Sequence, residues 1–216
     1  MKILVLGEHN ENEIQQATLC VVDAAKKLGG EIDIMLTTNA SDKVVNQASK
    51  IDSVSKVLHF SNERFQNIVG EDVAECALSI SDDYDFFLTS SSTTGKNILP
   101  RIAAKLDIQQ ISEIIEIIDP KTFKKPIYAG SCIATVSTSQ KKNALTIRTT
   151  SFDKAELGSG SAVVETKNCP NFSSRRTDFV KNELTVSDRP ELTAADIIVS
   201  GGRGMQNADN FALLDG

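Results

Sequence analysis

The sequence predicts an α/β fold, a three-layer domain with a mainly parallel sheet and helices on both of its faces. Short apolar runs alternate with segments whose apolar residues recur at helical spacing, which is the pattern of strands and helices in turn. This alternation indicates a parallel sheet that is covered on both faces. After residue 106 the pattern changes, and there we expect an antiparallel hairpin region.

The first half of the chain contains four pairs of a strand and a helix. Apolar runs predict strands at the following residues: 2–6, 32–36, 54–59 and 85–89. Helical spacing predicts helices at the following residues: 14–28, 42–50, 72–80 and 96–106. Gly29 and Gly30 end the first helix, and Ser41 or Asp42 is a suitable N-cap for the second.

The second half is less regular. Residues 127–138 and 144–149 are strand-like, and the turn SQKKN between them predicts a hairpin. Residues 111–118 are apolar with polar insertions, and residues 163–164 predict a further short strand. Residues 168–174 are polar, contain a proline and are a poor candidate for regular structure.

We expect three parts along the chain. Residues 1–185 form the α/β domain, residues 186–192 are a linker, and residues 193–216 begin a second α/β domain. In the last part, residues 197–199 predict a strand, and a glycine-rich turn and the first turn of a helix at residues 210–214 follow. A domain needs at least about 50 residues to hold its own core, so this last part is a stub.

Composition and charge exclude several classes of protein. The 216 residues can bury a sizeable core, and the net charge of −6 argues against nucleic acid or an anionic membrane surface as the main partner. The sequence has no apolar run of about 18 residues, so we expect no membrane insertion. The first residues lack the features of signal and transit peptides, which indicates a cytoplasmic protein.

The cysteines do not form a metal-binding pattern. None belongs to a Cys-x-x-Cys pair, and the two histidines are not near the four cysteines Cys20, Cys76, Cys132 and Cys169. We therefore expect no metal and reduced thiols, of which Cys20 and Cys76 are buried on helices. A combination of serine, histidine and acid cannot be recognised either, so we predict no catalytic residues.

The stretch FFLTSSSTTGKNILPRIAAKL resembles a phosphate-binding loop between a strand and a helix. The phosphate-loop pattern requires glycine where Ser90 stands and a hydroxyl residue where Asn97 stands. Because both positions fail, we expect a turn whose hydroxyls cap the helix, with Pro100 in its first turn and without binding of magnesium-ATP.

Two groups of basic residues are candidate contacts for an acidic partner. The sequence PKTFKKP carries Lys121, Lys124 and Lys125, and Arg175 and Arg176 form a second pair. A solvated turn is the other interpretation of each group. The acidic residues Asp82, Asp83 and Asp85 are expected to keep a loop solvated rather than to perform acid–base chemistry.

The turn SGGRG is the candidate cofactor-binding site. Gly201, Gly202 and Gly204 do not form the dinucleotide fingerprint, but Arg203 lies where backbone amides and the start of a helix favour an anion. A guanidinium at this place can pair with a phosphate or with the edge of a flavin. A purely structural turn is the alternative.

Four stretches together resemble the α subunit of electron transfer flavoproteins. They are TGKNILPRIAAKLDI, KTFKKPIYAGS, RTTSFD and SDRPELTAADIIVSGGRGMQNADNFALL, and their order and spacing are similar to the family along the whole chain. The last stretch is the most specific, and the amino-terminal pattern of strands and helices is less similar.

This resemblance implies a function. Members of the family are heterodimers with a β subunit, and each heterodimer holds one FAD. The flavin receives electrons from acyl-CoA dehydrogenases and related dehydrogenases, and passes them to a membrane-bound quinone oxidoreductase. The resemblance thus implies an electron carrier rather than an enzyme, in a bacterial cytoplasm or a mitochondrial matrix. It also implies that Arg203, between Gly202 and Gly204, contacts the flavin, and that residues 186–192 with Pro190 form a hinge between the domains.

The chain departs from the family pattern after the SGGRG turn. The later segments that complete the flavin site in the family are not in these 216 residues, so we expect a truncated product that does not retain FAD by itself. Two hypotheses follow, an electron carrier subunit with FAD and an isolated subunit-interaction module without redox activity. An unrelated nucleotide-binding enzyme is a third, disfavoured by the failed phosphate-loop pattern.

Overall fold

The computed structural model describes residues 1–10, 12–39, 42–158, 160–181, 183, 195 and 197–214. The chain divides into two compact units, Met1–Phe179 and Val180–Gly216, which are described separately below. The expected linker at residues 186–192, with its hinge, lies outside the described residues.

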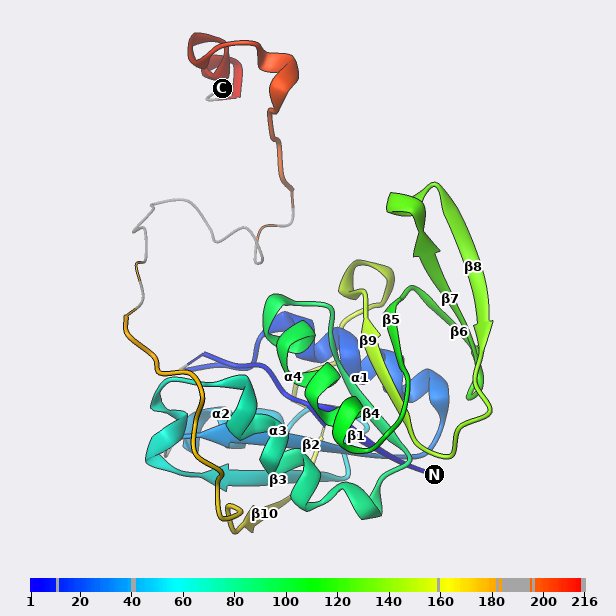
Figure 1. Cartoon of the computed structure of the whole chain (residues 1–216), viewed down its shortest axis with the longest axis vertical. Helices are drawn as coiled ribbons and strands as arrows, with labels where there is room; N and C mark the ends of the chain where they lie inside the picture. Colours follow the sequence, from blue (N-terminus) through cyan, green and yellow to red (C-terminus); the bar gives the residue numbers. More distant parts are fainter. Residues whose placement is uncertain are drawn as a thin grey trace. The chain divides into compact units, whose positions relative to one another are not determined.

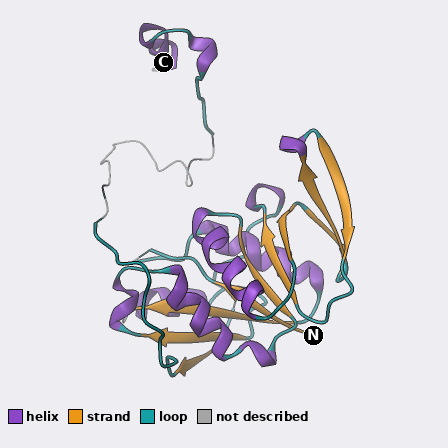
Figure 2. Ribbon diagram, in the orientation of Figure 1, coloured by secondary structure: helices purple, strands orange, loops and turns teal. Residues whose placement is uncertain are grey.

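A seven-stranded parallel sheet is the centre of the first unit (Figures 1 and 2). Its strands lie in the order β10-β3-β2-β1-β4-β9-β5. In chain order they are β1 (Lys2–Leu6), β2 (Glu31–Thr38), β3 (Lys56–Ser61), β4 (Phe86–Ser90), β5 (Gln110–Ile114), β9 (Asn143–Ile147) and β10 (Val163–Lys167).

In the described part of this unit, four α-helices cover the two faces of the sheet. Helices α1 (Gln16–Leu28) and α2 (Asp42–Ala48) pack on one face, and α3 (Gly70–Ser79) and α4 (Thr93–Lys105) pack on the other. Strand β1 shows why both faces are covered, because both of its faces are apolar. Ile3 and Val5 join the core cluster on one face, whereas the alternate residues Leu4 and Leu6 join the cluster on the other. The predicted three-layer α/β fold with helices on both faces is therefore confirmed. The described residues of this unit also contain four short 3-10 helices, η1 (Glu63–Gln66), η2 (Ser81–Asp83), η3 (Tyr128–Gly130) and η4 (Thr149–Ser151).

A separate three-stranded antiparallel sheet, which we call the arm, consists of β6 (Glu116–Asp119), β7 (Thr122–Ile127) and β8 (Cys132–Ser137). The antiparallel region was predicted, but the predicted pairing was wrong. Strand β8 pairs with β7 through the turn at Tyr128–Gly130, and not with β9 through SQKKN. Strand β9 instead enters the parallel sheet between β4 and β5, where all five of its residues are buried.

Two further predictions for the first unit need correction. Helix α4 begins at Thr93, three residues before the predicted start, so Pro100 lies inside the helix and outside its first turn. Lys124 and Lys125 lie in strand β7 rather than in a solvated turn, and only Lys121 belongs to the turn. The short strand predicted at residues 163–164 is confirmed as β10, and residues 168–174 have no regular structure, as expected.

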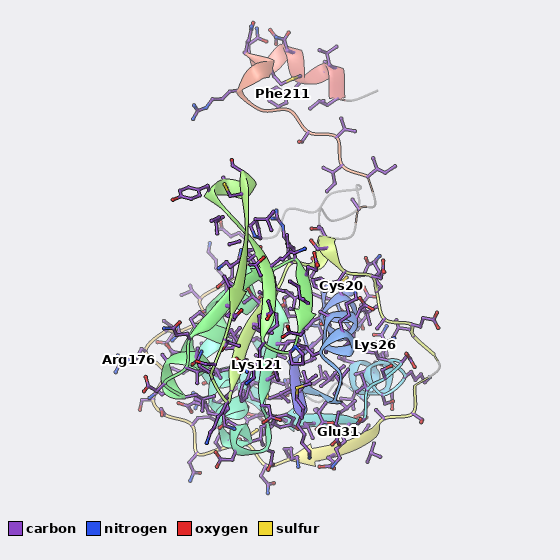
Figure 3. The ribbon with its side chains drawn as sticks, turned by 90° about the vertical axis from the view of Figure 1, so that its right-hand side faces the viewer. Cys20, Lys26, Glu31, Lys121, Arg176 and Phe211 are labelled. Atoms are coloured by element: carbon purple, nitrogen blue, oxygen red, sulfur yellow. The ribbon has the colours of Figure 1, made fainter. Side chains whose placement is uncertain are left out.

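The extended residues 168–176, which we call the strap, lie along helix α3. Arg175 donates hydrogen bonds from Nε, at 2.9 Å, and from Nη2 to the Asp72 carboxylate, which Arg64 also binds at 2.9 Å. The ring of Phe172 packs edge-on against Phe65 with 5.9 Å between the ring centres. The interpretation of Arg175 as a solvated residue was therefore wrong, whereas Arg176 is exposed (Figure 3).

The described part of the second unit contains two 3-10 helices, η5 (Arg203–Met205) and η6 (Ala208–Leu214). The helical start predicted at residues 210–214 thus lies in a 3-10 helix. The strand predicted at residues 197–199 does not form, and Ile197 and Val199 are 86% and 74% exposed. A strand requires a neighbouring strand for its backbone hydrogen bonds, and the described residues of this unit offer none.

Candidate functional site

The SGGRG turn is a small structure closed by its own backbone. The Met205 N–H donates to the Gly202 carbonyl at 2.9 Å, and the Gln206 N–H donates to the Arg203 carbonyl at 3.1 Å. The Asn210 side-chain amide donates to the Met205 carbonyl at 2.6 Å and so joins the turn to η6. Sequence alone thus placed a turn correctly here.

The three predicted cofactor-binding residues lie together in this turn and are exposed. A Cβ atom on Gly202 or Gly204 would meet no atom within 4 Å, so packing in the described structure does not require glycine at either position. Gly201 differs, because its Cβ would lie 2.7 Å from Met205 Cγ. The guanidinium of Arg203 has no hydrogen bond or ion pair within the described residues.

The arm is the second candidate site, and its base is anchored in the core of the first unit. Phe123 on β7 is fully buried in the core cluster that also holds helix α1. Ile117 and Val136 pack against the same cluster. Lys124 forms an ion pair with Glu116 at 2.9 Å across β6 and β7, while Lys121 lies exposed in the turn between them (Figure 3).

The tip of the arm, in contrast, presents apolar side chains to solvent. Ile127, Tyr128 and Ile133 are 37%, 80% and 54% exposed, and Cys132 is exposed beside them. In Figure 1 the turn between β7 and β8 extends beyond the main sheet. Tyr128 and Ala129 have positive φ angles of 50° and 54°, in a region that most residues avoid, so this turn is unusual for its sequence.

A hollow of about 730 Å³ lies beside the arm. Its walls come from the end of α4, from β5 and from β7 and β8, and Lys125 and Val136 line it on the side of the arm. The hollow lies at the base of the arm, because none of the exposed residues of the tip lines it. The exposed apolar side chains of the tip are by themselves typical of a surface that another protein covers. Sequence reasoning noted the YAGS stretch but did not place these side chains together.

A cluster of polar side chains lies at the carboxyl ends of β1 and β4. Glu8 follows β1 and accepts hydrogen bonds from the hydroxyls of Ser90 and Ser92, the latter at 2.8 Å to both carboxylate oxygens. Ser92 is also the N-cap of α4, because its Oγ accepts from the Gly95 N–H at 2.9 Å. The capping role predicted for this Ser/Thr-rich turn is confirmed, while the partner Glu8 was missed because it lies about 80 residues away.

The glycine of this turn has a structural reason. A Cβ on Gly95 would lie 2.1 Å from the Ser90 carbonyl oxygen, so α4 approaches the end of β4 closely because residue 95 is glycine. The resemblance of SSSTTGK to a phosphate loop therefore reflects helix packing. Lys96, the lysine of that pattern, pairs with Glu113 at 2.5 Å.

Buried ionisable groups also lie away from these sites. Burial raises the pKa of Asp33, whose Oδ2 accepts a 2.6 Å hydrogen bond from the Tyr84 hydroxyl. Burial likewise lowers the pKa of His59, whose Nε2 lies 2.8 Å from Thr38 Oγ1. Within the described residues no group of three or more His, Cys, Asp or Glu side chains could hold a metal. None of the helices described is both long and apolar enough to cross a membrane.

Comparison with known proteins gives a family. The electron transfer flavoprotein domain matches residues 3–170. The electron transfer flavoprotein subunit alpha of Pseudomonas aeruginosa is 47% identical over 214 residues, which are 99% of this chain and 69% of that protein. The mitochondrial subunit alpha of Dictyostelium discoideum is 36% identical over 98% of this chain and 64% of its own length.

The subunit alpha of Paracoccus denitrificans is 35% identical over the whole of this chain and 69% of its own length. The chain thus spans about two thirds of the relatives that it matches. The similarity includes both the α/β unit and the residues of the SGGRG turn, because the aligned regions extend over nearly all 216 residues. The chain therefore belongs to the electron transfer flavoprotein family, as a homologue of its α subunits.

Proposed function

We propose that the chain works as the α subunit of an electron carrier, which takes electrons from acyl-CoA dehydrogenases and related dehydrogenases and delivers them to a membrane-bound quinone oxidoreductase. The observation that carries this proposal is the 47% identity to an α subunit over 99% of the chain. The relatives come from bacteria and mitochondria, so we place this work in a bacterial cytoplasm or a mitochondrial matrix.

In this proposal the first unit docks a β subunit through the arm. The exposed Ile127, Tyr128 and Ile133 supply the apolar surface that a lasting subunit interface needs. The anchored base supports the proposal, because Phe123 holds β7 in the core and keeps the tip in place before the partner arrives. We name the exposed side chains of the tip as the docking surface.

The second unit contributes to FAD binding in this proposal. FAD supplies the redox chemistry, since a flavin accepts electrons in pairs and releases them singly. Arg203 would hold an anionic or electron-rich edge of this cofactor, because its guanidinium is exposed and has no partner among the described residues. Gly202 and Gly204 would let the cofactor approach the backbone, since no packing occupies the space of a Cβ atom there.

A protein recovered from its own cells tests this function. An affinity tag at the amino terminus of the protein, encoded at the chromosomal locus, would purify the protein together with its bound partner proteins. We expect a β subunit in equal amount, a flavin spectrum in the visible range, and bleaching of that spectrum by an acyl-CoA dehydrogenase with its substrate. Recovery of the chain without a β subunit would overturn the proposal.

A second function is a docking module without redox activity. It is favoured by one observation, that the described part of the second unit contains only short 3-10 helices and exposed glycines around Arg203. The same purification separates the two functions, because the module would arrive with the β subunit but without a flavin spectrum.

A further inference from the structure

Two cysteines that are far apart in the sequence lie together in the fold. Cys76 on α3 is fully buried in the core cluster between that helix and the sheet. Cys169, the second residue of the strap, is half-buried and packs against the same cluster. The two thiols are hydrogen-bonding partners of each other. The fold therefore pairs two sulfur atoms that the sequence separates.

The chain on either side of Cys169 holds this residue beside α3. Strand β10, which pairs with β3, ends just before the strap. The Cys169 thiol donates to the Ser61 carbonyl at 3.6 Å. Further along the strap, the Ser173 N–H donates at 3.0 Å to the carboxylate of Glu75, the residue before Cys76. Cys169 thus lies between two attachments of the strap, and its contact with Cys76 follows from the topology.

The other two cysteines lack this arrangement and serve as references. Cys20 is also a buried residue of a helix, but it lies in the core cluster on the opposite face of the sheet. Cys132 is exposed at the tip of the arm. A reaction that requires two neighbouring thiols should therefore involve Cys76 and Cys169 and leave Cys20 unchanged.

The exposure of the two thiols gives them different roles. Cys76 has no exposed surface, so Cys169 is the one that meets a small solute first. Burial raises the pKa of both thiols, so the reactive thiolate is scarce at neutral pH and oxidation should be slow. The hydrogen bond between them lowers the pKa of Cys169 and raises that of Cys76, which favours Cys169 as the nucleophile and Cys76 as the resolving thiol.

We propose that Cys76 and Cys169 form a reversible disulfide when the protein meets hydrogen peroxide, and that this bond locks the strap to α3. Cys169 Sγ attacks one peroxide oxygen, the O–O bond breaks, and a sulfenic acid forms while the other oxygen leaves as water with the thiol proton. Cys76 Sγ then attacks the Cys169 sulfur, the S–O bond breaks, and the hydroxyl leaves as a second water with the Cys76 proton. The two thiols lose two electrons in total, and the peroxide gains them.

The strap is suited to this reaction. The sulfur atoms must approach to about 2 Å, and residues 168–174 belong to no helix or strand that would resist the movement. Asp72, which binds Arg175, lies one helical turn before Cys76, so the disulfide would add a covalent attachment to an ionic one on the same face of α3. Disulfides that form in reducing compartments are typically transient and sense oxidants. The site uses neither the arm nor Arg203, so it does not depend on the proposed function.

Peptide mapping of the peroxide-treated 216-residue chain tests this proposal. The protein is oxidised at mildly alkaline pH, its remaining thiols are alkylated in denaturant, and the digest is analysed by mass spectrometry with and without dithiothreitol. We expect two peptides joined through Cys76 and Cys169 that dithiothreitol separates, while Cys20 in the same digest stays a free thiol. Amide exchange at Ser173 should slow at least about threefold in the oxidised protein, because the disulfide removes open conformations of the strap.

Three variants test the roles of the cysteines. In Cys76→Ala no resolving thiol remains, so Cys169 should accumulate as a sulfenic acid that dimedone labels. In Cys169→Ser, Cys76 should stay a thiol because it has no exposed surface. Cys20→Ala is the matched control, since it removes another buried cysteine from a helix, and it should leave the disulfide unchanged.

Three results would overturn the proposal, and all of them come from the wild-type chain. Full alkylation of Cys76 and Cys169 while peroxide oxidises the exposed Cys132 would show that the pair does not react. Oxidation of Cys169 to a sulfinic acid, with Cys76 still a thiol, would show that Cys76 does not resolve the sulfenic acid. An unchanged exchange rate at Ser173 in the disulfide-linked protein would show that the bond does not lock the strap.

Discussion

At the scale of single residues, Asp33 is the buried acid with an incomplete set of partners. Its Oδ2 accepts from Tyr84, but Oδ1 is buried and has no partner within the described residues. Burial raises its pKa in the folded state above the ordinary value of 3.8. Folding therefore binds the proton more tightly, so the contribution of Asp33 to stability is full below pH 3.8 and is lost as the pH rises through the folded pKa.

Asp33→Asn should consequently help the protein most at neutral pH. The amide carries no charge to desolvate, so we expect the free energy of unfolding at pH 7 to rise by about 1 kcal/mol. Near pH 4 the variant and the wild type should be nearly equal. Urea denaturation at both pH values measures this, with Asp82→Asn, an exposed acid, as the control for a lost surface charge. The argument would be contradicted if Asp33→Asn lowered the free energy of unfolding, and lowered it more at pH 7 than at pH 4.

Gly95 supports a prediction from steric contact. A methyl group at this position would collide with the Ser90 carbonyl oxygen, which is backbone and cannot move aside cheaply. We expect Gly95→Ala to lower the free energy of unfolding by about 1–3 kcal/mol, as overpacking does in other cores. Thr93→Ala in the same helix is the control. Equal stability of Gly95→Ala and Thr93→Ala in urea would show that α4 adjusts without cost.

At the scale of elements, the strap is held to α3 by one buried carboxylate. Asp72 is 3% exposed in its side chain and binds both Arg64 and Arg175. The backbone N–H of Ser173 donates to Glu75 at 3.0 Å and that of Arg176 to Glu71 at 3.2 Å, so the strap depends on α3 along its length. Adjacent arginines therefore differ in role, since Arg175 is paired with Asp72 and the side chain of Arg176 is exposed.

Arg175→Ala should release the strap, whereas Arg176→Ala should not. Loss of charge-assisted hydrogen bonds to a buried acid should cost about 2 kcal/mol. Hydrogen exchange at Ser173 and Arg176 should become faster in Arg175→Ala, with less change in the central strands. The same acceleration in both variants would mean that general charge, and not the pair with Asp72, holds the strap.

The elements also show what the sequence could predict and why the remainder was missed. Apolar periodicity found each strand and each α-helix of the first half, but not η1 and η2, because both faces of the sheet are buried and constrain the pattern. It also predicted strands where β8 and β9 lie, but their predicted pairing was wrong, since a turn such as SQKKN permits local pairing or entry into a distant sheet. The sequence NALTI contained a usable signal. A hairpin strand with one solvent-exposed face alternates apolar and polar residues, and NALTI does not, which agrees with the burial of all five residues of β9.

The candidate sites were predictable only in part for a similar reason. Arg203 could be named as a candidate because its signal is local, a glycine-rich turn with one cation, and its cofactor-binding role stays a prediction. The group of Glu8, Ser90 and Ser92 joins residues about 80 positions apart, and the tip of the arm depends on a turn at Tyr128–Gly130 with unusual φ angles. Neither the group around Glu8 nor the tip of the arm has a local sequence pattern, so neither could be predicted before the topology was known.

At the scale of the whole molecule, we predict that a polypeptide of these 216 residues does not retain FAD. Arg203 and its turn offer a few charge-assisted hydrogen bonds, each of about 1.5–3 kcal/mol. Immobilising a large cofactor costs several kcal/mol or more, which leaves an affinity of roughly millimolar. Mixing the chain with FAD, desalting it and recording the visible spectrum tests this. A yellow protein with near-stoichiometric flavin would contradict it, and Arg203→Ala would then show whether the turn belongs to the site.

The central claim is that this homologue of α subunits docks a β subunit through the arm. Size exclusion of the chain co-expressed with its cognate β subunit tests it most directly, alongside the double variant Tyr128→Ser, Ile133→Ser and the control Val164→Ser. Val164 is an exposed apolar residue on β10, away from the arm. We predict one peak with both subunits at micromolar concentration for the wild type and the control, and separate peaks for the double variant. Separate elution of the wild-type chain, or co-elution of the double variant, would contradict the claim.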